Sequence, residues 1–214
     1  MANHSLVAEQ FENLEQQIHA GRLGMWIFLA TEIMFFGGMF TGYTVYRNMY
    51  PTAFAMASRE TSYLLGTLNT FVLLTSSLTV VLALHSARLA KRKALITYLL
   101  LTIGLGVLFL GFKFLEYYQH YRDHLLPGYD FVFNPAFSRP ASLFFCFYFA
   151  MTGVHALHMI IGVGLMTFLL ILAVRDRIKP EYPAHVDIIG LYWHFVDIIW
   201  IFLYPLLYLI DRHA

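Results

Sequence analysis

The segment LYWHFVDIIW, residues 191–200, decides how this chain folds. It places His194 and Asp197 one helical turn apart inside a run, residues 187–210, that is otherwise almost wholly apolar. In water this would be an ordinary i,i+3 pair on one helix face. In a bilayer, an ionisable group in the hydrocarbon costs about 2.5 kcal/mol or more, so it must face protein or a partner. The segment therefore predicts a membrane helix with one face turned toward other helices.

The composition supports a membrane protein. Of 214 residues, 59% are hydrophobic and 13% are charged, about half the charged fraction of an ordinary soluble chain. A formal net charge of +1 points to no nucleic-acid partner, and the single Cys146 excludes both an intrachain disulfide and a four-cysteine metal site. The first 21 residues lack the basic region of a cleavable signal peptide, which predicts that the first apolar segment is a permanent span.

The hydropathy pattern predicts an all-α, polytopic membrane protein with five transmembrane helices. The spans are expected at about 24–46, 62–85, 94–118, 141–174 and 187–210, after a polar N-terminal segment over 1–22 and within one domain over 23–212. Only Pro205 falls inside a span. Before the first span, Phe11, Leu14 and Ile18 recur at helical spacing, which leaves a short interfacial helix open.

The distribution of Lys and Arg predicts the orientation, because short cytoplasmic loops carry the excess of positive charge. One side of the membrane receives Arg22, the basic cluster Arg88, Lys91, Arg92 and Lys93, and the basic residues of 175–179; the other receives Arg47, Arg59 and Lys113 among others. The N-terminus is therefore expected inside and the C-terminus outside. The basic cluster is also expected to meet anionic lipid headgroups.

Several polar residues fall at membrane depth and are expected to form hydrogen-bonded clusters. Counted at 1.5 Å per residue, one layer lies about 13 Å from the inner ends and a second at about 24 to 28 Å. The first layer holds Glu32, Ser76, Ser77 and Asp197, and the second holds Asn69, His155 and His158. The simplest interpretation of Glu32 is a protonated acid that donates to a neighbouring helix; a proton relay or an ion site is the alternative.

Three further patterns have simple structural interpretations. His155 and His158 resemble half of a metal site, but a heme site needs histidines on facing helices, so a hydrogen-bonded pair is favoured. Glu116 beside two tyrosines is typical of an interfacial anchor, and no chemistry is expected there. Glycines at 38 and 42 have the spacing of closely packed helices and predict that the first span packs inside protein.

Five motifs in this order resemble subunit III of the heme-copper respiratory oxidases, in its five-helix bacterial form. They are LGMW and ATEIMFFGG at 23–26 and 30–38, the Asn69, Ser76, Ser77 and His85 set, KFLEYY at 113–118, TGVHALHMIIG at 152–162 and YWHFVDIIW at 192–200. The resemblance covers residues 23–210. The seven-helix members have two further spans before the Glu-bearing helix, which puts their lipid-filled cleft in doubt here unless another subunit supplies those helices.

The resemblance implies a subunit with no heme, copper or other metal of its own, in an enzyme complex whose heme and copper lie in partner subunits. It implies contact mainly with subunit I, also with subunit II and small subunits or a respiratory supercomplex, and location in the bacterial inner (plasma) membrane. It implies phospholipid binding and support of proton uptake. Glu32 carries over as the family's buried carboxylate, and His155, His158 and His194 carry over as buried polar residues. Trp26, Trp193, Trp200 and the basic cluster are expected at lipid or at an interface, and no residue is expected to be catalytic.

The alternative functions belong to different classes of membrane protein. The variants YWH at 192–194 and ATE at 30–32 favour a cytochrome c oxidase, with a quinol oxidase or a nitric-oxide-reductase-associated homologue as the alternative. An autonomous proton or ion transporter is disfavoured because the chain has no inverted repeat and no Gly/Pro-broken helix pair. A heme-bearing electron-transfer subunit is the third class.

Overall fold

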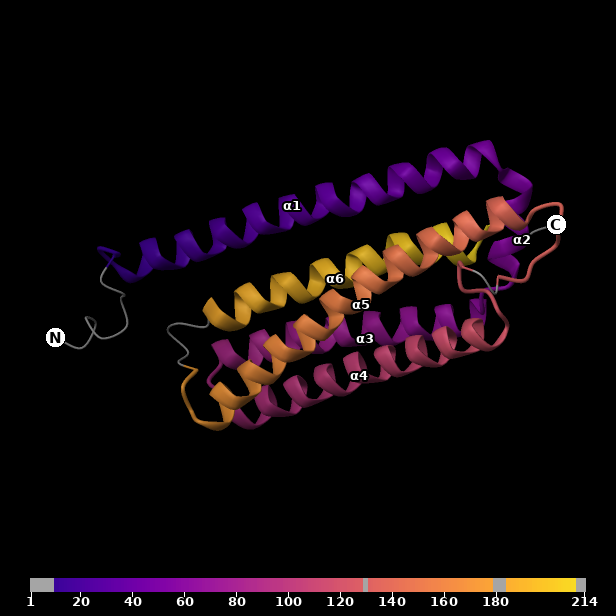
Figure 1. The fold of residues 1–214 in the computed structure, drawn as a ribbon. Helices are drawn as coiled ribbons and strands as arrows, with labels where there is room; N and C mark the ends of the chain where they lie inside the picture. The colour runs from indigo at the N-terminus through magenta and orange to yellow at the C-terminus, as the bar shows by residue number, and fades with distance from the viewer. Residues whose placement is uncertain (1–9, 129–130, 179–183, 211–214) are drawn as a thin grey trace.

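The computed structural model describes residues 10–128, 131–178 and 184–210, and this part of the chain contains helices and connections without a strand (Figure 1). Five helices are long and apolar enough to cross a membrane, as predicted. The elements are α1 (Leu14–Met49), α2 (Pro51–Arg59), α3 (Tyr63–Arg88), α4 (Arg92–Arg122), α5 (Ser138–Val174) and α6 (Ala184–Tyr208). The last four agree with the predicted spans within a few residues. Residues 211 and 212, the end of the predicted domain, lie outside the described residues.

The first helix begins about three turns earlier than its predicted span. The Asn13 side chain caps it by accepting a hydrogen bond from the backbone N–H of Gln16 at 2.8 Å. From Leu14 the helix continues without a break to Met49. The separate interfacial helix proposed around Phe11 and Ile18 is therefore wrong, because the polar residues of 14–22 form the first turns of α1 itself.

The short helix α2 is an element that hydropathy did not predict, because it is too short to span a membrane. Pro51 stands at its first position, where the missing N–H costs nothing. Its apolar side, with Phe54 and Ala57 fully buried, packs on α5 and also touches α1 and α6. This helix connects α1 to α3 at one end of the molecule. We call that end the α2 end and the opposite end, where α1 begins, the N-terminal end.

The long helices are arranged in layers. Figure 1 shows α5 and α6 in the middle, α3 and α4 on one side and α1 on the other. Within the described residues α1 contacts α5, α6 and α2 but neither α3 nor α4. The α3–α6 helices therefore form a four-helix bundle, and α1 lies along its edge.

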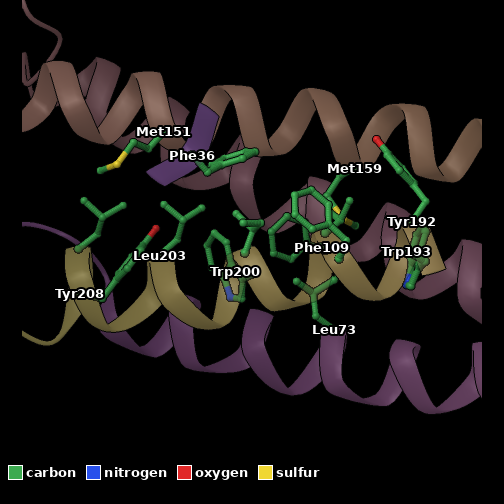
Figure 2. Close-up of a cluster of buried hydrophobic side chains, with 14 of the residues drawn as sticks. Phe36, Leu73, Phe109, Met151, Met159, Tyr192, Trp193, Trp200, Leu203 and Tyr208 are labelled. Carbon is green, nitrogen blue, oxygen red and sulfur yellow. The ribbon is translucent and has the colours of Figure 1, made fainter. Parts of the chain in front are cut away.

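The centre of the bundle is built around the two indole rings of α6. Trp193 and Trp200 are both fully buried and lie in the row of apolar side chains that Figure 2 shows. Trp193 fits between α4 and α5 because two glycines face it: a Cβ on Gly106 would lie 2.8 Å from the indole, and one on Gly162 would lie 3.0 Å from it. Trp193 and Trp200 were expected in packing or at lipid, and both are fully buried in packing within the chain.

Candidate functional site

The clearest polar contact at mid-span joins α1 to α5. Glu32 Oε2 lies 3.1 Å from His158 Nε2, and both side chains are largely buried, with exposed fractions of 19% and 12%. His158 Nδ1 lies 2.9 Å from the carbonyl oxygen of Val154, which can only accept, so Nδ1 carries a hydrogen. The Glu32–His158 bond then holds one proton between the two groups. Either a neutral acid donates to a neutral ring, or an imidazolium donates to a carboxylate.

Aromatic groups enclose this pair. The Phe36 ring meets the His158 ring edge-on at a centroid distance of 5.5 Å, and Tyr192 lies parallel to it at 6.4 Å. The Tyr192 hydroxyl donates to the backbone carbonyl of His158 at 3.1 Å. The site therefore combines one shared proton with an apolar enclosure, and both helices of the middle layer contribute to it.

Two further polar contacts hold α1 to the bundle, one near each end. At the N-terminal end Arg22 donates to Asp187 of α6, with its Nη2 at 2.6 Å and its Nε at 2.8 Å. At the α2 end the Tyr43 hydroxyl donates to the carbonyl of Leu206 at 2.6 Å. With the Glu32–His158 pair, α1 thus has one polar contact at each of three levels.

The predicted separation into two layers is wrong for Glu32 and His158, because these two residues are in contact. The depth of Glu32 was counted from residue 24, but α1 starts at Leu14. The depth of His158 was counted from the end of α5, and that helix is too long for its end to mark the membrane surface. The two predicted packing glycines differ: a Cβ on Gly38 would meet nothing within 4 Å, whereas one on Gly42 would lie 3.4 Å from the Phe147 ring of α5. Only Gly42 therefore lies close to a helix of this chain's own bundle.

The pair of polar residues on α6, His194 and Asp197, faces α3. The Ser77 hydroxyl lies 2.7 Å from His194 Nδ1, and the Trp193 indole N–H donates to Ser76 at 2.7 Å. Asp197 is 3% exposed, and neither of its carboxyl oxygens has a hydrogen-bond partner within the described residues, although Ser77 lies close by. Contacts between α3 and α6 therefore provide hydrogen-bond partners for His194 and Ser76, while the Asp197 carboxyl group is buried without a direct hydrogen bond.

Asn69 and His155 are also buried without a partner. Asn69 is fully buried, and neither polar atom of its side chain is bonded in the part of the chain that the structure describes. The same holds for both ring nitrogens of His155, which packs against Phe109 and Trp200. Of the predicted polar residues, Glu32, His158, Ser76 and His194 form bonds, and Asn69, His155 and Asp197 do not.

A buried ion pair on α4 was not predicted. Lys113 Nζ lies 2.9 Å from Glu116 Oε2, and the two side chains are 2% and 1% exposed. The Lys113 ammonium donates to Tyr148 and Tyr208, and the Tyr208 hydroxyl donates to Glu116. The expectation of an interfacial anchor at Glu116 is wrong, because this group lies inside the bundle. The i,i+3 spacing of Lys113 and Glu116 in an apolar run is the sequence signal that could have identified this pair.

The predicted interface residues have different surroundings. Trp26 is 58% exposed and lines a groove between α1 and α6 with a volume of about 410 Å³. In the basic cluster, Arg88 approaches Asp187 at 3.7 Å, and Arg92 donates to the last carbonyls of α5, those of Ala173 and Val174. Arg92 therefore caps the end of α5 and Arg88 lies close to α6, while the side chains of Lys91 and Lys93 are exposed.

The groove between α1 and α6 is almost entirely apolar, and its only polar ring is that of His194. It is lined by Trp26, Leu29, Ile33, Phe36, Gly37, Phe40, Leu191, His194, Phe195, Ile198, Ile199 and Phe202. The described residues contain no group of three His, Cys, Asp or Glu side chains placed to hold a metal ion. The fold and these contacts define a multi-pass helical membrane protein whose polar groups join its own helices.

Comparison with known proteins identifies the family. Residues 12–211 match the family model described as cytochrome c oxidase subunit III. The chain is 32% identical to quinol oxidase subunit 3 of Bacillus subtilis strain 168 over 200 residues, which cover 92% of this chain and 91% of that protein. It is 30% identical to cytochrome c oxidase subunit 3 of Alkalihalophilus pseudofirmus over 190 residues, covering 87% and 85%.

A third relative, the probable quinol oxidase subunit 3 of Staphylococcus saprophyticus, is 28% identical over 202 residues, covering 92% of this chain and 94% of that protein. The chain therefore belongs to the subunit III family of the heme-copper respiratory oxidases. Membership makes it a component of an oxidase with other subunits, in a family that binds no metal cofactor itself.

Proposed function

We propose that this chain is the non-redox structural subunit of a proton-pumping terminal oxidase, which stabilises catalytic subunit I and supports proton uptake during sustained turnover. The Glu32–His158 pair is the observation that supports this role most directly. The pair holds a proton at mid-span, where α1 meets the bundle. Its carboxylate, Glu32, is the acidic residue of the motif at 30–38. We further propose that the N-terminal end faces the inside of a bacterial plasma membrane, as the loop charges favour.

We also propose that the α1–α6 groove binds one acyl chain of a phospholipid. Its volume of about 410 Å³ lies within the ordinary range of ligand sites. From Trp26 to Phe40 its wall is about 21 Å long at 1.5 Å per residue, close to the length of an extended acyl chain. Because the lining is apolar, it cannot bind a polar headgroup, so the headgroup would lie near the end of the groove.

The test of the structural role is Glu32→Ala in the assembled oxidase. We expect unchanged heme spectra together with weaker retention of this chain on purification or a shorter active lifetime during turnover. Glu15→Ala is the matched control, because Glu15 lies on the same helix with an exposed side chain. Normal retention and a normal lifetime in the Glu32 variant would refute the role, as would purification of the chain without a heme- and copper-bearing subunit.

The electron donor is proposed to be cytochrome c, on the motif variants at 30–32 and 192–194. The names of two relatives favour a quinol donor, so quinol oxidase is the second candidate. Oxygen uptake by the purified complex with reduced cytochrome c, and separately with a quinol, decides between them. Uptake with quinol alone would overturn the cytochrome c assignment and leave the structural role unaffected.

A further inference from the structure

Glu116 and His120 form a second polar site, near the α2 end of the bundle. They stand one turn apart on α4 and are 1% and 3% exposed. The His120 ring packs edge-on against Tyr148 of α5 at a centroid distance of 5.1 Å. The Tyr148 hydroxyl in turn accepts from the ammonium of Lys113 at 3.1 Å. Glu116 and His120 therefore lie on the same buried side of α4 and flank one tyrosine.

The carboxylate of Glu116 is hydrogen-bonded through only one of its oxygens. Oε2 accepts from Lys113 at 2.9 Å and from Tyr208 at 2.8 Å. Oε1 is shielded from solvent and has no partner within the described residues. A buried polar atom left unpaired is unfavourable, and more so when it is charged. A hydrogen-bond donor next to Oε1 would therefore stabilise the carboxylate.

Among the described residues, His120 leaves one ring nitrogen unpaired in the interior of the bundle. The imidazole also lies next to the backbone of Glu60, whose carbonyl can only accept a hydrogen. Nδ1 is the ring nitrogen that is buried without a partner in the described part of the chain. A neutral imidazole has one donor and one acceptor, so Nδ1 is the acceptor when Nε2 carries the hydrogen toward the Glu60 carbonyl. Nδ1 and Glu116 Oε1 thus both need a hydrogen, and neither can give one to the other.

We propose that a water molecule is bound between Glu116 Oε1 and His120 Nδ1 and donates one hydrogen to each. Water is the small ligand with two hydrogens to donate, and buried waters ordinarily make two to four hydrogen bonds to otherwise unpaired groups. Side chains one helical turn apart are neighbours on the helix surface, so one water can reach both groups. A metal ion fits less well, because Lys113 already neutralises Glu116 and no third metal-binding side chain joins the pair among the described residues.

The bound water gives the buried ion pair a continuous connection to the end of the bundle. The connection starts at His120, beside the backbone of Glu60, and passes through the water to Glu116 and then by hydrogen bonds to Lys113, Tyr148 and Tyr208. Glu60 ends α2, so this chain of bonds ties the α2–α3 connection to the centre of the bundle. The water site therefore positions Glu116 for its bond with Lys113.

A density map of the full oxidase, at a resolution that shows ordered waters elsewhere in the chain, tests the proposal directly. We expect a water peak within about 3.2 Å of both Glu116 Oε1 and His120 Nδ1. Well-ordered side chains with no peak between them would overturn the proposal, as would a peak with metal-like density and ligand distances or a direct bond from a protein donor to Oε1.

Radiolytic labelling tests the site in the native chain without any substitution. Radicals formed from a bound water modify side chains beside it even when bulk solvent cannot reach them. We expect Tyr148 to be modified several-fold faster than Tyr43, since both tyrosine rings are fully buried but only Tyr148 adjoins the proposed water. Equal and negligible modification of the two rings would contradict the proposal.

A variant separates the water from the histidine. His120→Phe keeps a ring against Tyr148 but removes Nδ1, so we expect the water peak and the labelling of Tyr148 to be lost. His124→Phe is the matched control, because His124 lies exposed one turn later. Retention of both signals in folded His120→Phe would overturn the bridging role of His120.

Discussion

The edge helix α1 and the α3–α6 bundle are held in different ways. Of the most apolar window of α1, 11% is buried within the chain, compared with 56% for α6. Helix α1 is joined to the bundle by three polar contacts spread along its length, whereas α6 packs against α3 and α5 on one side and α1 on another. The comparison teaches that polar groups at membrane depth serve two purposes here: attachment of a separable helix, and completion of a packed interior.

The largest expected effect comes from breaking the buried ion pair of the bundle. Lys113→Met leaves the Glu116 carboxylate buried without its counter-charge, which costs about 3 to 5 kcal/mol. We expect a large loss of folded protein and a lower midpoint in thermal unfolding in detergent. The double variant Lys113→Met/Glu116→Gln should recover most of the loss, and exposed Lys93→Met should change little. If the single variant were as stable as Lys93→Met, the ion pair would not stabilise the bundle.

An intermediate effect is expected from filling the space beside Trp193. Gly106→Ala places a methyl group 2.8 Å from the indole, and overpacking of this kind costs about 1 to 3 kcal/mol. Gly111→Ala on the same helix is the control, because its Cβ would meet nothing within 4 Å. Thermal unfolding of the two variants measures the difference. Equal midpoints would show that Trp193 moves aside without cost.

A smaller effect is expected from removing one polar contact of α1. Tyr43→Phe deletes the hydroxyl that donates to Leu206, at a cost of about 1 kcal/mol. We expect faster hydrogen exchange in α1 with little change in the α3–α6 bundle. Tyr63→Phe, at an exposed position on α3, is the control. Equal acceleration in all helices would remove the distinction between edge helix and bundle.

The smallest effect is expected at the N-terminal end. Arg22→Gln breaks the bond to Asp187, but the Arg22 side chain is 45% exposed, so the contact is screened by solvent and contributes at most about 1 kcal/mol. Arg88 also approaches Asp187 and partly replaces the lost charge. Raising the salt concentration should reduce the difference between this variant and the native chain. A salt-independent loss would mean that Arg22 acts through packing.

The helices were predictable because hydropathy and length act locally. An apolar run of about 20 residues can satisfy its backbone in lipid only as a helix, so the four spans from α3 to α6 followed directly from composition. The start of α1 did not follow, because a helix can extend beyond the membrane through polar residues such as those after Asn13. Helix α2 was missed for a related reason: a nine-residue helix is stabilised by its packing on α5, which leaves no hydropathy signal.

The polar residues were predictable as a set but not as pairs. Charge in an apolar run marked Glu32, Asp197 and the histidines for burial, and all of them are buried or largely buried. Which atom meets which depends on tilt, helix rotation and register, and these are set by packing between helices. The distinction between Glu32, which bonds His158, and Asp197, which bonds no described residue, therefore had no counterpart in the spacing.

The sequence by itself determined a membrane protein of five spanning helices and, through its motifs, the oxidase subunit III family. Both depend on local chemistry, because each span must be apolar along its own length and each motif lies within a single helix. The tertiary structure alone decided that α1 lies at the edge, that LYWHFVDIIW turns its indoles inward, and that Lys113 and Glu116 form a buried pair. These depend on contacts between segments far apart in the chain, where the shape of each neighbour decides the outcome.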